Sequence, residues 1–299
     1  MPLISFTDAW QAYRRAEPRL PAKPAPVTPT RVPGIGALIE HFDLVILDSW
    51  GVLNLGDHPI TGAREAVAAL RRSGMPLLAL SNDASGDKTR AVANHRRRGY
   101  DFAASEVIHG LDLLPETLAR LALARPVGLI ADPPVPMTAI TGALQPLADD
   151  EQCYDDVSGV VFLSADRWTS ERQEMLRRSL TPRRRPLIVC NPDIASPNGD
   201  TQNAEPGFYA HRLAEEIGIQ PIFCGKPFPE IYRRALAAFP GIRRERVLCV
   251  GDTLHTDILG ARAAGLRAML VENGFVAGRD ALSLASESGI WPDFIAPRL

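Results

Sequence analysis

Polar residues stand at four places where a short hydrophobic run of the sequence ends. Asp48 follows "LVIL", Ser81 and Asn82 follow "LLAL", Lys226 follows "IFCG", and Asp252 follows "LCVG". Ligands of open parallel α/β sheets bind at the carboxyl ends of the strands, so these distant positions can converge on one site. Each position alone is as readily a turn or a helix cap, but together they supply carboxylates, a hydroxyl and an ammonium.

This set of groups suits phosphoryl transfer. A carboxylate such as Asp48 can attack phosphorus and form an aspartyl-phosphate, which divides hydrolysis into two easier steps. The carboxylate and the phosphate repel each other, so the site needs cations. Asp48 and Asp252 could hold a hard Mg²⁺ ion, and Lys226 adds a point charge. Ser81 and nearby backbone N–H groups can bind the remaining phosphate oxygens.

A further carboxylate, Asp257, stands at the start of a predicted helix in "GDTLHTD". It could order a metal-bound water, or it could cap the helix beside Thr256, and both interpretations stay open. Only three of the 33 basic residues are lysine. A lysine retained at position 226 therefore fits a need for a compact ammonium group.

Short apolar runs alternate with amphipathic helices from Asp43 onward. The predicted strands are 43–47, 76–80, 106–110, 126–132, 159–163, 186–190, 221–225, 246–251 and 267–271, and a polar loop fills most of 191–207. This alternation predicts parallel sheets covered on both faces, in two α/β domains with the second inserted into the first. Before them, residues 1–33 predict a helical arm on a Pro-rich linker.

The composition excludes several classes of protein. The chain has 299 residues, 45% of them hydrophobic, and a net charge of -2 with dispersed basic residues, so we expect no nucleic-acid partner. Its four cysteines show no metal-ligand spacing. The N-terminus lacks a signal-peptide pattern, and no apolar run approaches the ~20 residues of a membrane span. We therefore expect a cytoplasmic protein without membrane contact.

Four ordered segments resemble the motifs of the haloacid dehalogenase (HAD) superfamily. They are "LDSWGVLNLG", "LALSN", "CGKPFPEIYRRAL" and "VLCVGDTLHTDILGARAAGLRAMLV". The stretch between the second and third motifs, with "CNPD" at 190–193, is similar to the type-two cap of subfamily IIA, which contains nitrophenyl-phosphatase-like and pyridoxal-phosphatase-like enzymes. The resemblance implies a Rossmann-like, doubly wound parallel-sheet core with an inserted α/β cap domain. The implied boundaries are 1–34 for the arm and linker, 35–122 and 205–299 for the core, and 123–204 for the cap.

The resemblance also implies a metal site. Asp48 matches the nucleophile, which is also a Mg²⁺ ligand, and the backbone carbonyl of Trp50 matches the second protein contact to the metal. Asp252 matches a direct ligand of the metal, and Asp257 matches one that acts through water.

Other matched positions concern the phosphate and the substrate. Ser81 matches the phosphate-binding hydroxyl with Asn82 as its neighbour, and Lys226 matches the motif-three lysine, which is catalytic and binds phosphate. Asn191 and Asp193 fall in a cap stretch that often faces the substrate. Dimers formed through the cap are frequent in subfamily IIA, so the resemblance leaves a homodimer open.

Trp50 is a departure from the family pattern. Phosphatases of the family usually carry an aspartate there as general acid and base, whereas an indole N–H only donates a hydrogen bond. The loss of a general acid and base lowers the rate by a factor on the order of 10² to 10⁴. The tryptophan matches a branch of subfamily IIA with Asp-x-Trp-Gly in motif one. Substrates with good leaving groups, or another acid such as Asp83, Asp57 or His58, would compensate.

Two functions therefore follow from the sequence. The leading one is a Mg²⁺-dependent phosphatase of a small phosphorylated metabolite that acts through Asp48. The alternative is a catalytically weak or inactive protein that binds a phosphorylated ligand for regulation, because Trp50 has ended turnover.

Overall fold

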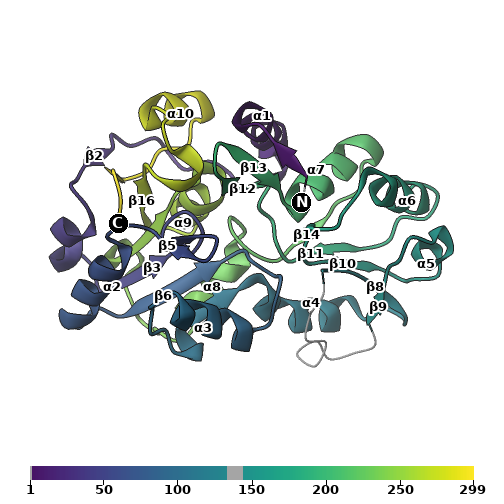
Figure 1. Cartoon of the computed structure of the whole chain (residues 1–299), viewed down its shortest axis with the longest axis horizontal. Coiled ribbons are helices and arrows are strands. Elements are labelled where there is room, and N and C mark those ends of the chain that lie inside the picture. The colour runs from purple at the N-terminus through teal and green to yellow at the C-terminus, as the bar shows by residue number, and fades with distance from the viewer. Residues whose placement is uncertain (1, 133–143) are drawn as a thin grey trace. The chain divides into compact units, whose positions relative to one another are not determined.

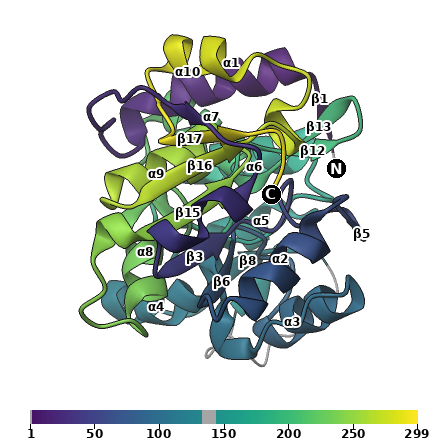
Figure 2. The same ribbon diagram turned by 90° about the vertical axis from the view of Figure 1, so that its left-hand side faces the viewer.

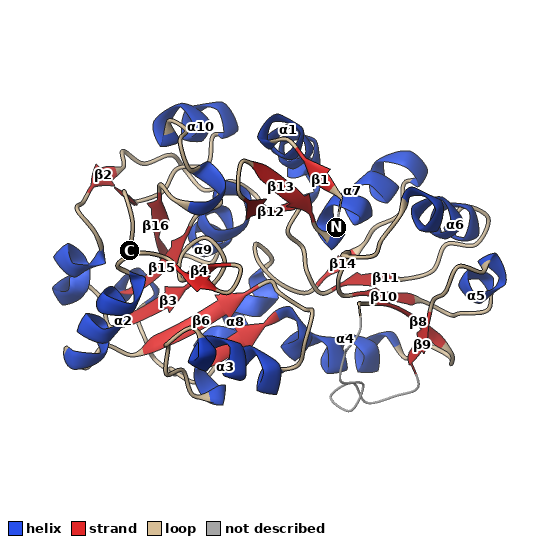
Figure 3. Ribbon diagram, viewed as in Figure 1, coloured by secondary structure: helices blue, strands red, loops and turns tan. Residues whose placement is uncertain are grey.

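The computed structural model describes residues 2–132 and 144–299, and it divides into two compact units (Figure 1). The first unit comprises Met1–Ala12, Asn82–Asp87 and His109–Gly225. The second comprises Tyr13–Ser81, Lys88–Ile108 and Lys226–Leu299. Each unit is built on its own parallel sheet, as Figure 3 shows in red.

The sheet of the second unit has seven strands. Their order is β2 (Thr30–Arg31), β17 (Phe294–Ala296), β16 (Arg267–Val271), β15 (Val247–Gly251), β3 (Leu44–Leu47), β6 (Leu77–Ser81) and β7 (Val107–His109). Strand β15 pairs in parallel with β16 and with β3, and β3 pairs in parallel with β6. Figure 2 shows β16, β15, β3 and β6 side by side. Strand β15 is therefore the central strand and β3 is its neighbour, and the predicted motif-four and motif-one aspartates directly follow them.

Helices follow the strands of this unit. They are α2 (Ala63–Arg72), α3 (Lys88–Arg97), α8 (Pro229–Leu236), α9 (Leu259–Ala263) and α10 (Ala281–Ser288). Helix α2 places Val67 and Leu70 in the same core cluster as Val45 and Leu47 of β3. Every residue of β3 and of β15 is buried, so both faces of the sheet are covered. The predicted fold class, a doubly wound parallel α/β core with a second α/β domain, is confirmed.

The first unit holds a five-stranded parallel sheet. Its order is β14 (Ile222–Phe223), β11 (Leu187–Val189), β10 (Val160–Phe162), β8 (Val127–Ile130) and β9 (Leu144–Pro146). Its helices are α4 (Leu114–Leu121), α5 (Glu151–Asp155), α6 (Ser170–Leu180) and α7 (Pro206–Ile217). The core cluster contains Phe162 of β10 together with Trp168 and Tyr209, whose rings pack against it.

A small antiparallel sheet stands where the sequence predicted only a polar loop. Its order is β1 (Leu3–Ile4), β13 (Thr201–Ala204) and β12 (Ala195–Asn198). The hairpin turns at Gly199, whose φ of +60° suits glycine. These strands carry Ser, Asn, Gln, Thr and Pro without apolar alternation, and one partner comes from the N-terminus. The pairing is therefore non-local, and the loop prediction was wrong here.

The stretch 205–225 bears on the predicted domain boundaries. Helix α7 and strand β14 lie in the first unit, and β14 pairs in parallel with β11. The sequence instead assigned this stretch to the second part of the core, and the boundaries stay a prediction. The N-terminal arm forms helix α1 (Phe6–Ala16) and the 3₁₀ turn η1 (Glu17–Arg19). Among the described residues, no helix is both long and apolar enough to cross a membrane.

Candidate active site

Asp48 and Asp252 stand at the ends of two neighbouring parallel strands. Asp48 directly follows β3, and its backbone N–H donates to the carbonyl oxygen of Val250 in β15 at 2.9 Å. Asp252 directly follows β15. The register pairs Leu47 with Val250, so both carboxylates leave the sheet at the same edge. Their exposed fractions are only 7% and 2%, although an ionised carboxylate normally needs water or a partner.

The segment after Asp48 forms a tight turn that ends in a hairpin. The Ser49 carbonyl oxygen accepts the N–H groups of Leu53 and Asn54, and the Gly51 N–H donates to the Asn54 carbonyl at 2.8 Å. Trp50 is half-buried and forms an isolated bridge with Asn54. Strands β4 (Asn54–Leu55) and β5 (His58–Pro59) then pair in antiparallel fashion. The turn therefore holds the backbone at position 50 beside the nucleophile candidate.

Two glycines leave room for the Asp252 carboxylate. Gly51 has φ +90° and Gly274 has φ +66°, and a Cβ atom at either position would collide with that carboxylate. The Phe275 N–H donates to Asp252 Oδ2 at 2.7 Å, and Thr253 Oγ1 donates to Oδ1 at 2.9 Å. The carboxylate is therefore fixed from two sides, and only glycine fits beside it.

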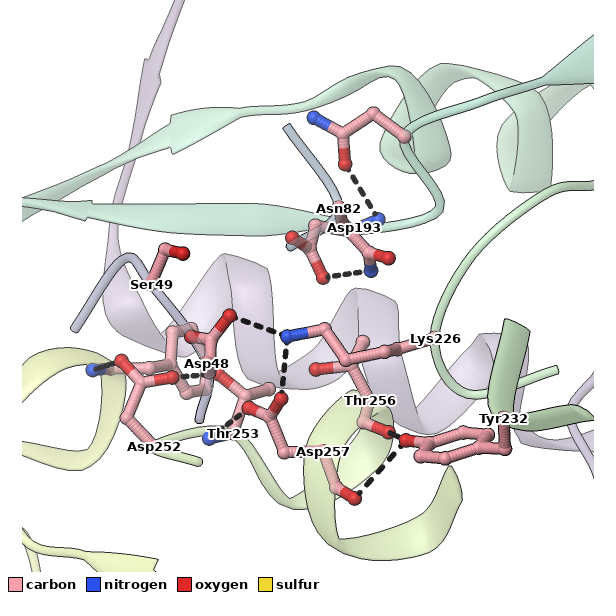
Figure 4. Close-up of polar contacts among 12 residues, drawn as sticks. Asp48, Ser49, Asn82, Asp193, Lys226, Tyr232, Asp252, Thr253, Thr256 and Asp257 are labelled. Carbon is pink, nitrogen blue, oxygen red and sulfur yellow. Dashed lines mark hydrogen bonds and ion pairs between the residues drawn. The ribbon is translucent and has the colours of Figure 1, made fainter. Parts of the chain in front are cut away.

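Lys226 joins two of the carboxylates. Its ammonium donates to Asp48 Oδ1 at 2.5 Å and to Asp257 Oδ1 at 2.7 Å, as the dashed lines of Figure 4 show. Asp257 lies in the π-helical turn η7 (Leu254–Ile258), and its Oδ2 accepts the backbone N–H of Thr253 at 3.1 Å. The lysine side chain is 4% exposed, so this network is shielded from bulk water. The Asp257 carboxylate therefore stabilises its own turn through one oxygen and contacts the lysine through the other.

The three aspartates fit a divalent cation. Asp48, Asp252 and Asp257 are buried, and each offers one carboxylate oxygen within 4.8 Å of the others. Burial, reinforced by the charges of Asp48 and Asp257, raises the pKa of Asp252 well above its usual range. Three ionised carboxylates and one ammonium would leave two negative charges without compensation. An all-oxygen site of this charge fits a hard cation such as Mg²⁺.

Ser81 belongs to the same edge of the sheet. It is the last residue of β6 and is half-buried. Strand β6 pairs with β3 in a register that matches Ala79 with Leu47, so Ser81, at the end of β6, lies level with the residue after Asp48. The structure thus brings together Asp48, Asp252, Asp257 and Lys226 in one network, with Ser81 at the same edge.

The remaining predicted residues lie in the first unit, described here by itself. Asn82 Nδ2 donates to Asp193 Oδ1 at 2.9 Å (Figure 4). Asn191 Oδ1 accepts the Asp193 N–H at 3.1 Å, and Asn191 Nδ2 donates to Glu205 Oε2 at 3.0 Å. Asn191 therefore orders the loop around Asp193.

Glu205 is a buried residue that the sequence interpretation missed. Ser196 Oγ donates to its Oε1 at 2.5 Å, while Asn191 holds the other oxygen. Burial raises the pKa of Glu205 to about 8, although the Ser196 hydrogen bond opposes that change. The only sequence signal was its place directly before Pro206, the first residue of α7. Nothing in the spacing pointed to Ser196.

The side chains named as substitute acids lie in different surroundings. Asp57 is 67% exposed on its side chain, and Arg97 Nη2 donates to it at 2.9 Å. The Arg97 hydrogen bond lowers the pKa of Asp57, which suits a permanent carboxylate better than an acid. His58 and Asp83 are exposed, and Asp83 Oδ1 accepts the Ser85 N–H at 2.8 Å.

Comparisons with known proteins agree with these motifs. A family model described as haloacid dehalogenase-like hydrolase matches residues 45–135, and one described as HAD-hydrolase-like matches 223–299. The acid sugar phosphatase of Staphylococcus epidermidis is 24% identical over 236 residues, which cover 79% of this chain and 88% of that protein.

Solved structures share the fold. A possible sugar phosphatase of the HAD superfamily from Cytophaga hutchinsonii has a TM-score of 0.79 and 23% identity, over 91% of this chain and 98% of that one. The 4-nitrophenylphosphatase of Thermotoga maritima has a TM-score of 0.68 and 24% identity, over 87% and 96%. The chain belongs to the haloacid dehalogenase superfamily of hydrolases, and these relatives support its placement in subfamily IIA.

Proposed function

We propose that this protein is a Mg²⁺-dependent phosphomonoesterase that hydrolyses small phosphorylated metabolites through an aspartyl-phosphate on Asp48. One observation carries the proposal. Asp48 stands at a strand end, buried, hydrogen-bonded to Lys226 and within 4.8 Å of two further carboxylates through its oxygen. This is the arrangement that a carboxylate nucleophile and a charge-neutralising site require.

The chemistry divides into two displacements at phosphorus. A carboxylate oxygen of Asp48 forms a bond to phosphorus while the bond to the ester oxygen breaks, and the leaving oxygen departs as an anion that takes its proton from water. Water then attacks the phosphorus of the aspartyl-phosphate, which releases inorganic phosphate and restores the carboxylate. Bound Mg²⁺, held by Asp48, Asp252 and the Trp50 carbonyl, and by Asp257 through a water, would supply positive charge to the phosphoryl oxygens.

Lys226 and Ser81 complete the proposed phosphate site. The Lys226 ammonium neutralises charge on Asp48 and on the phosphoryl group, and its contact with Asp257 fixes its direction. The Ser81 hydroxyl donates to a phosphoryl oxygen, with Asn82 as its chain neighbour. In the first unit, we propose that Asn191 and Asp193 contribute to substrate choice.

Trp50 limits the substrates that this site turns over rapidly. Without a carboxyl group at position 50, the leaving oxygen departs without a proton from that position. Esters whose leaving groups are stable as anions need this help least, so we propose a preference for aryl and acyl phosphates over alkyl phosphates.

The relatives do not favour the alternative of an inactive regulatory protein, because they are phosphatases by name. The acid sugar phosphatase among them makes sugar phosphates a natural first class to test. A homodimer stays a prediction from the resemblance.

A direct test compares the wild type with Asp48→Asn. Both are assayed with Mg²⁺ on p-nitrophenyl phosphate, acetyl phosphate and a panel of sugar phosphates. We expect the wild type to hydrolyse the first two, and Asp48→Asn to fall to the background rate because an amide oxygen is a poor nucleophile. Asp101→Asn, at an exposed position, makes the same chemical change and should retain full activity. Equal rates for the wild type and Asp48→Asn across the panel would exclude the proposed mechanism.

A further inference from the structure

The N-terminal arm lies outside both family models, which begin at residues 45 and 223, yet it contacts the motif-four segment. The Tyr13 ring stacks on His255 with centroids 5.0 Å apart and an interplanar angle of 16°. Glu17 Oε1 lies 3.1 Å from His255 Nε2. Tyr13 is 1% exposed and His255 is fully buried, so these contacts are internal to the second unit.

His255 belongs to the turn that carries one of the proposed metal ligands. It lies in η7, two residues before Asp257. The π-helical geometry closes this turn with N–H groups of Asp257 and Ile258 that both donate to the Thr253 carbonyl oxygen, at 3.0 and 3.3 Å. Displacement of the imidazole would therefore move the backbone on which the Asp257 carboxylate is mounted.

Tyr13 also contacts the segment that fixes the other motif-four ligand. The edge of one ring meets the face of the other between Tyr13 and Phe275, with centroids 5.5 Å apart and an interplanar angle of 79°. The backbone N–H of Phe275 donates to Asp252 Oδ2. A single tyrosine of the arm thus contacts both segments that position the motif-four carboxylates.

The Glu17 carboxylate is a permanent acceptor for this contact. Arg14 Nη1 and Lys23 Nζ each donate to it at 2.7 Å, one on each oxygen. Burial alone would raise the pKa of Glu17, but the hydrogen bonds from His255 and Lys23 outweigh it and lower the pKa to about 2. The carboxylate is therefore charged across the neutral range, and the contact with His255 needs no change of protonation.

We propose that Tyr13 and Glu17 are positioning residues of the metal site, through which the N-terminal arm holds His255 and Phe275, and hence Asp257 and Asp252, in the geometry that binds the cation. This inference rests on the proposed function in one respect, the assignment of the two aspartates as metal ligands. Groups that orient metal ligands typically change metal affinity by 10- to 100-fold when they are removed.

The test measures the loops and the metal separately in the full-length chain. Tyr13→Leu and Glu17→Ala remove the two contacts. Tyr13→Phe keeps both ring contacts, and Gln11→Ala alters an exposed position of the same helix. We expect amide hydrogen exchange to rise in segments 252–258 and 274–276 of the first two variants, but not in β3. We also expect calorimetric titration to show Mg²⁺ binding about tenfold weaker. Both controls should match the wild type.

The outcomes separate this inference from the proposed function. Wild-type exchange in both segments and wild-type Mg²⁺ affinity in Tyr13→Leu and Glu17→Ala would overturn the positioning role, whatever the activity. Raised exchange in β3 as well would also overturn it, because it would show general destabilisation. A third outcome is that the two variants show increased exchange only in these segments, while the wild type hydrolyses no phosphate ester. That result would support the positioning role and reject the proposed function.

Discussion

The two units each bury carboxyl groups, but they neutralise them in different ways. In the second unit, Asp48 and Asp257 share the Lys226 ammonium, and Asp252 lies in the same cluster. In the first unit, Glu205 accepts hydrogen bonds from the neutral side chains of Asn191 and Ser196, and its pKa rises to about 8. The charges of Asp48 and Asp257 are therefore balanced by an ammonium group, whereas Glu205 is neutralised by a proton.

The difference indicates which cluster is built to bind a ligand. A buried carboxyl that becomes neutral by protonation needs no further charge, so Glu205 can be part of a stable loop. Three ionised carboxylates around one ammonium carry a net negative charge, and their repulsion adds to the burial that raises the pKa of Asp252 unless a further cation joins them. The cluster at Asp48 therefore costs stability in the absence of metal, as catalytic clusters often do.

The largest expected effect comes from the removal of the Lys226 ammonium group. Lys226→Met leaves Asp48 and Asp257 buried without their ammonium partner, so we expect a loss of about 3–5 kcal/mol in the free energy of unfolding, measured in urea without metal. Lys23→Met breaks the more exposed ion pair with Glu17 and should cost about 0–1 kcal/mol. A similar small loss in both variants would mean that the Asp48 cluster does not depend on Lys226 for charge.

The pH dependence of stability tests the other cluster. The pKa of Glu205 is about 8 in the folded protein against an ordinary value of 4.5. Between these values the folded state holds a proton that the unfolded chain has released. The free energy of unfolding therefore falls as the pH rises, by about 1.4 kcal/mol per pH unit, and the loss is complete above about pH 8.

Glu205→Gln should remove this contribution, because an amide stays neutral at every pH. We expect the variant to lose less stability than the wild type between pH 5 and pH 8 in urea unfolding, whereas Glu116→Gln, at an exposed position of α4, should follow the wild type. An unchanged slope in Glu205→Gln would show that this carboxyl does not hold its proton in the folded state.

The smallest expected effect concerns Trp50. Trp50→Asp restores a general acid, so we expect kcat/KM to rise by roughly 10- to 100-fold for an alkyl phosphate. This gain is below the full effect of general acid–base catalysis, and the gain for p-nitrophenyl phosphate should be far smaller. Trp50→Phe removes the indole without adding an acid and should bring no gain. An equal response of both substrate classes would mean that proton donation is not what the site lacks.

The sequence predicted the parts that depend on local pattern. The apolar runs at 43–47 and 246–251 appear as β3 and β15, and the polar residues after them meet as expected, because parallel strands end at a common edge. The motifs also led to the correct superfamily. The roles assigned to Asp48, Ser81, Lys226, Asp252 and Asp257 remain proposals supported by this geometry.

The sequence did not predict the parts that depend on distant partners. The β12–β13 hairpin pairs with β1 from the N-terminus, and its polar residues gave no periodic signal. Glu205 acquires its raised pKa from burial, and the contacts of Tyr13 with His255 and Phe275 join residues about 240 or more positions apart. Such contacts follow from packing, which single-sequence patterns do not encode.

The central claim is that Asp48 itself attacks phosphorus, and a trapping experiment tests it most directly. The protein is mixed with ³²P-labelled acetyl phosphate and Mg²⁺, quenched in acid, digested, and the labelled peptide is identified. Because no carboxylate at position 50 activates water, we expect the intermediate to accumulate and the label to appear on the peptide that contains Asp48. The label should be absent from Asp48→Asn and present in Asp101→Asn. Label on a different residue, or wild-type turnover by Asp48→Asn, would contradict the account.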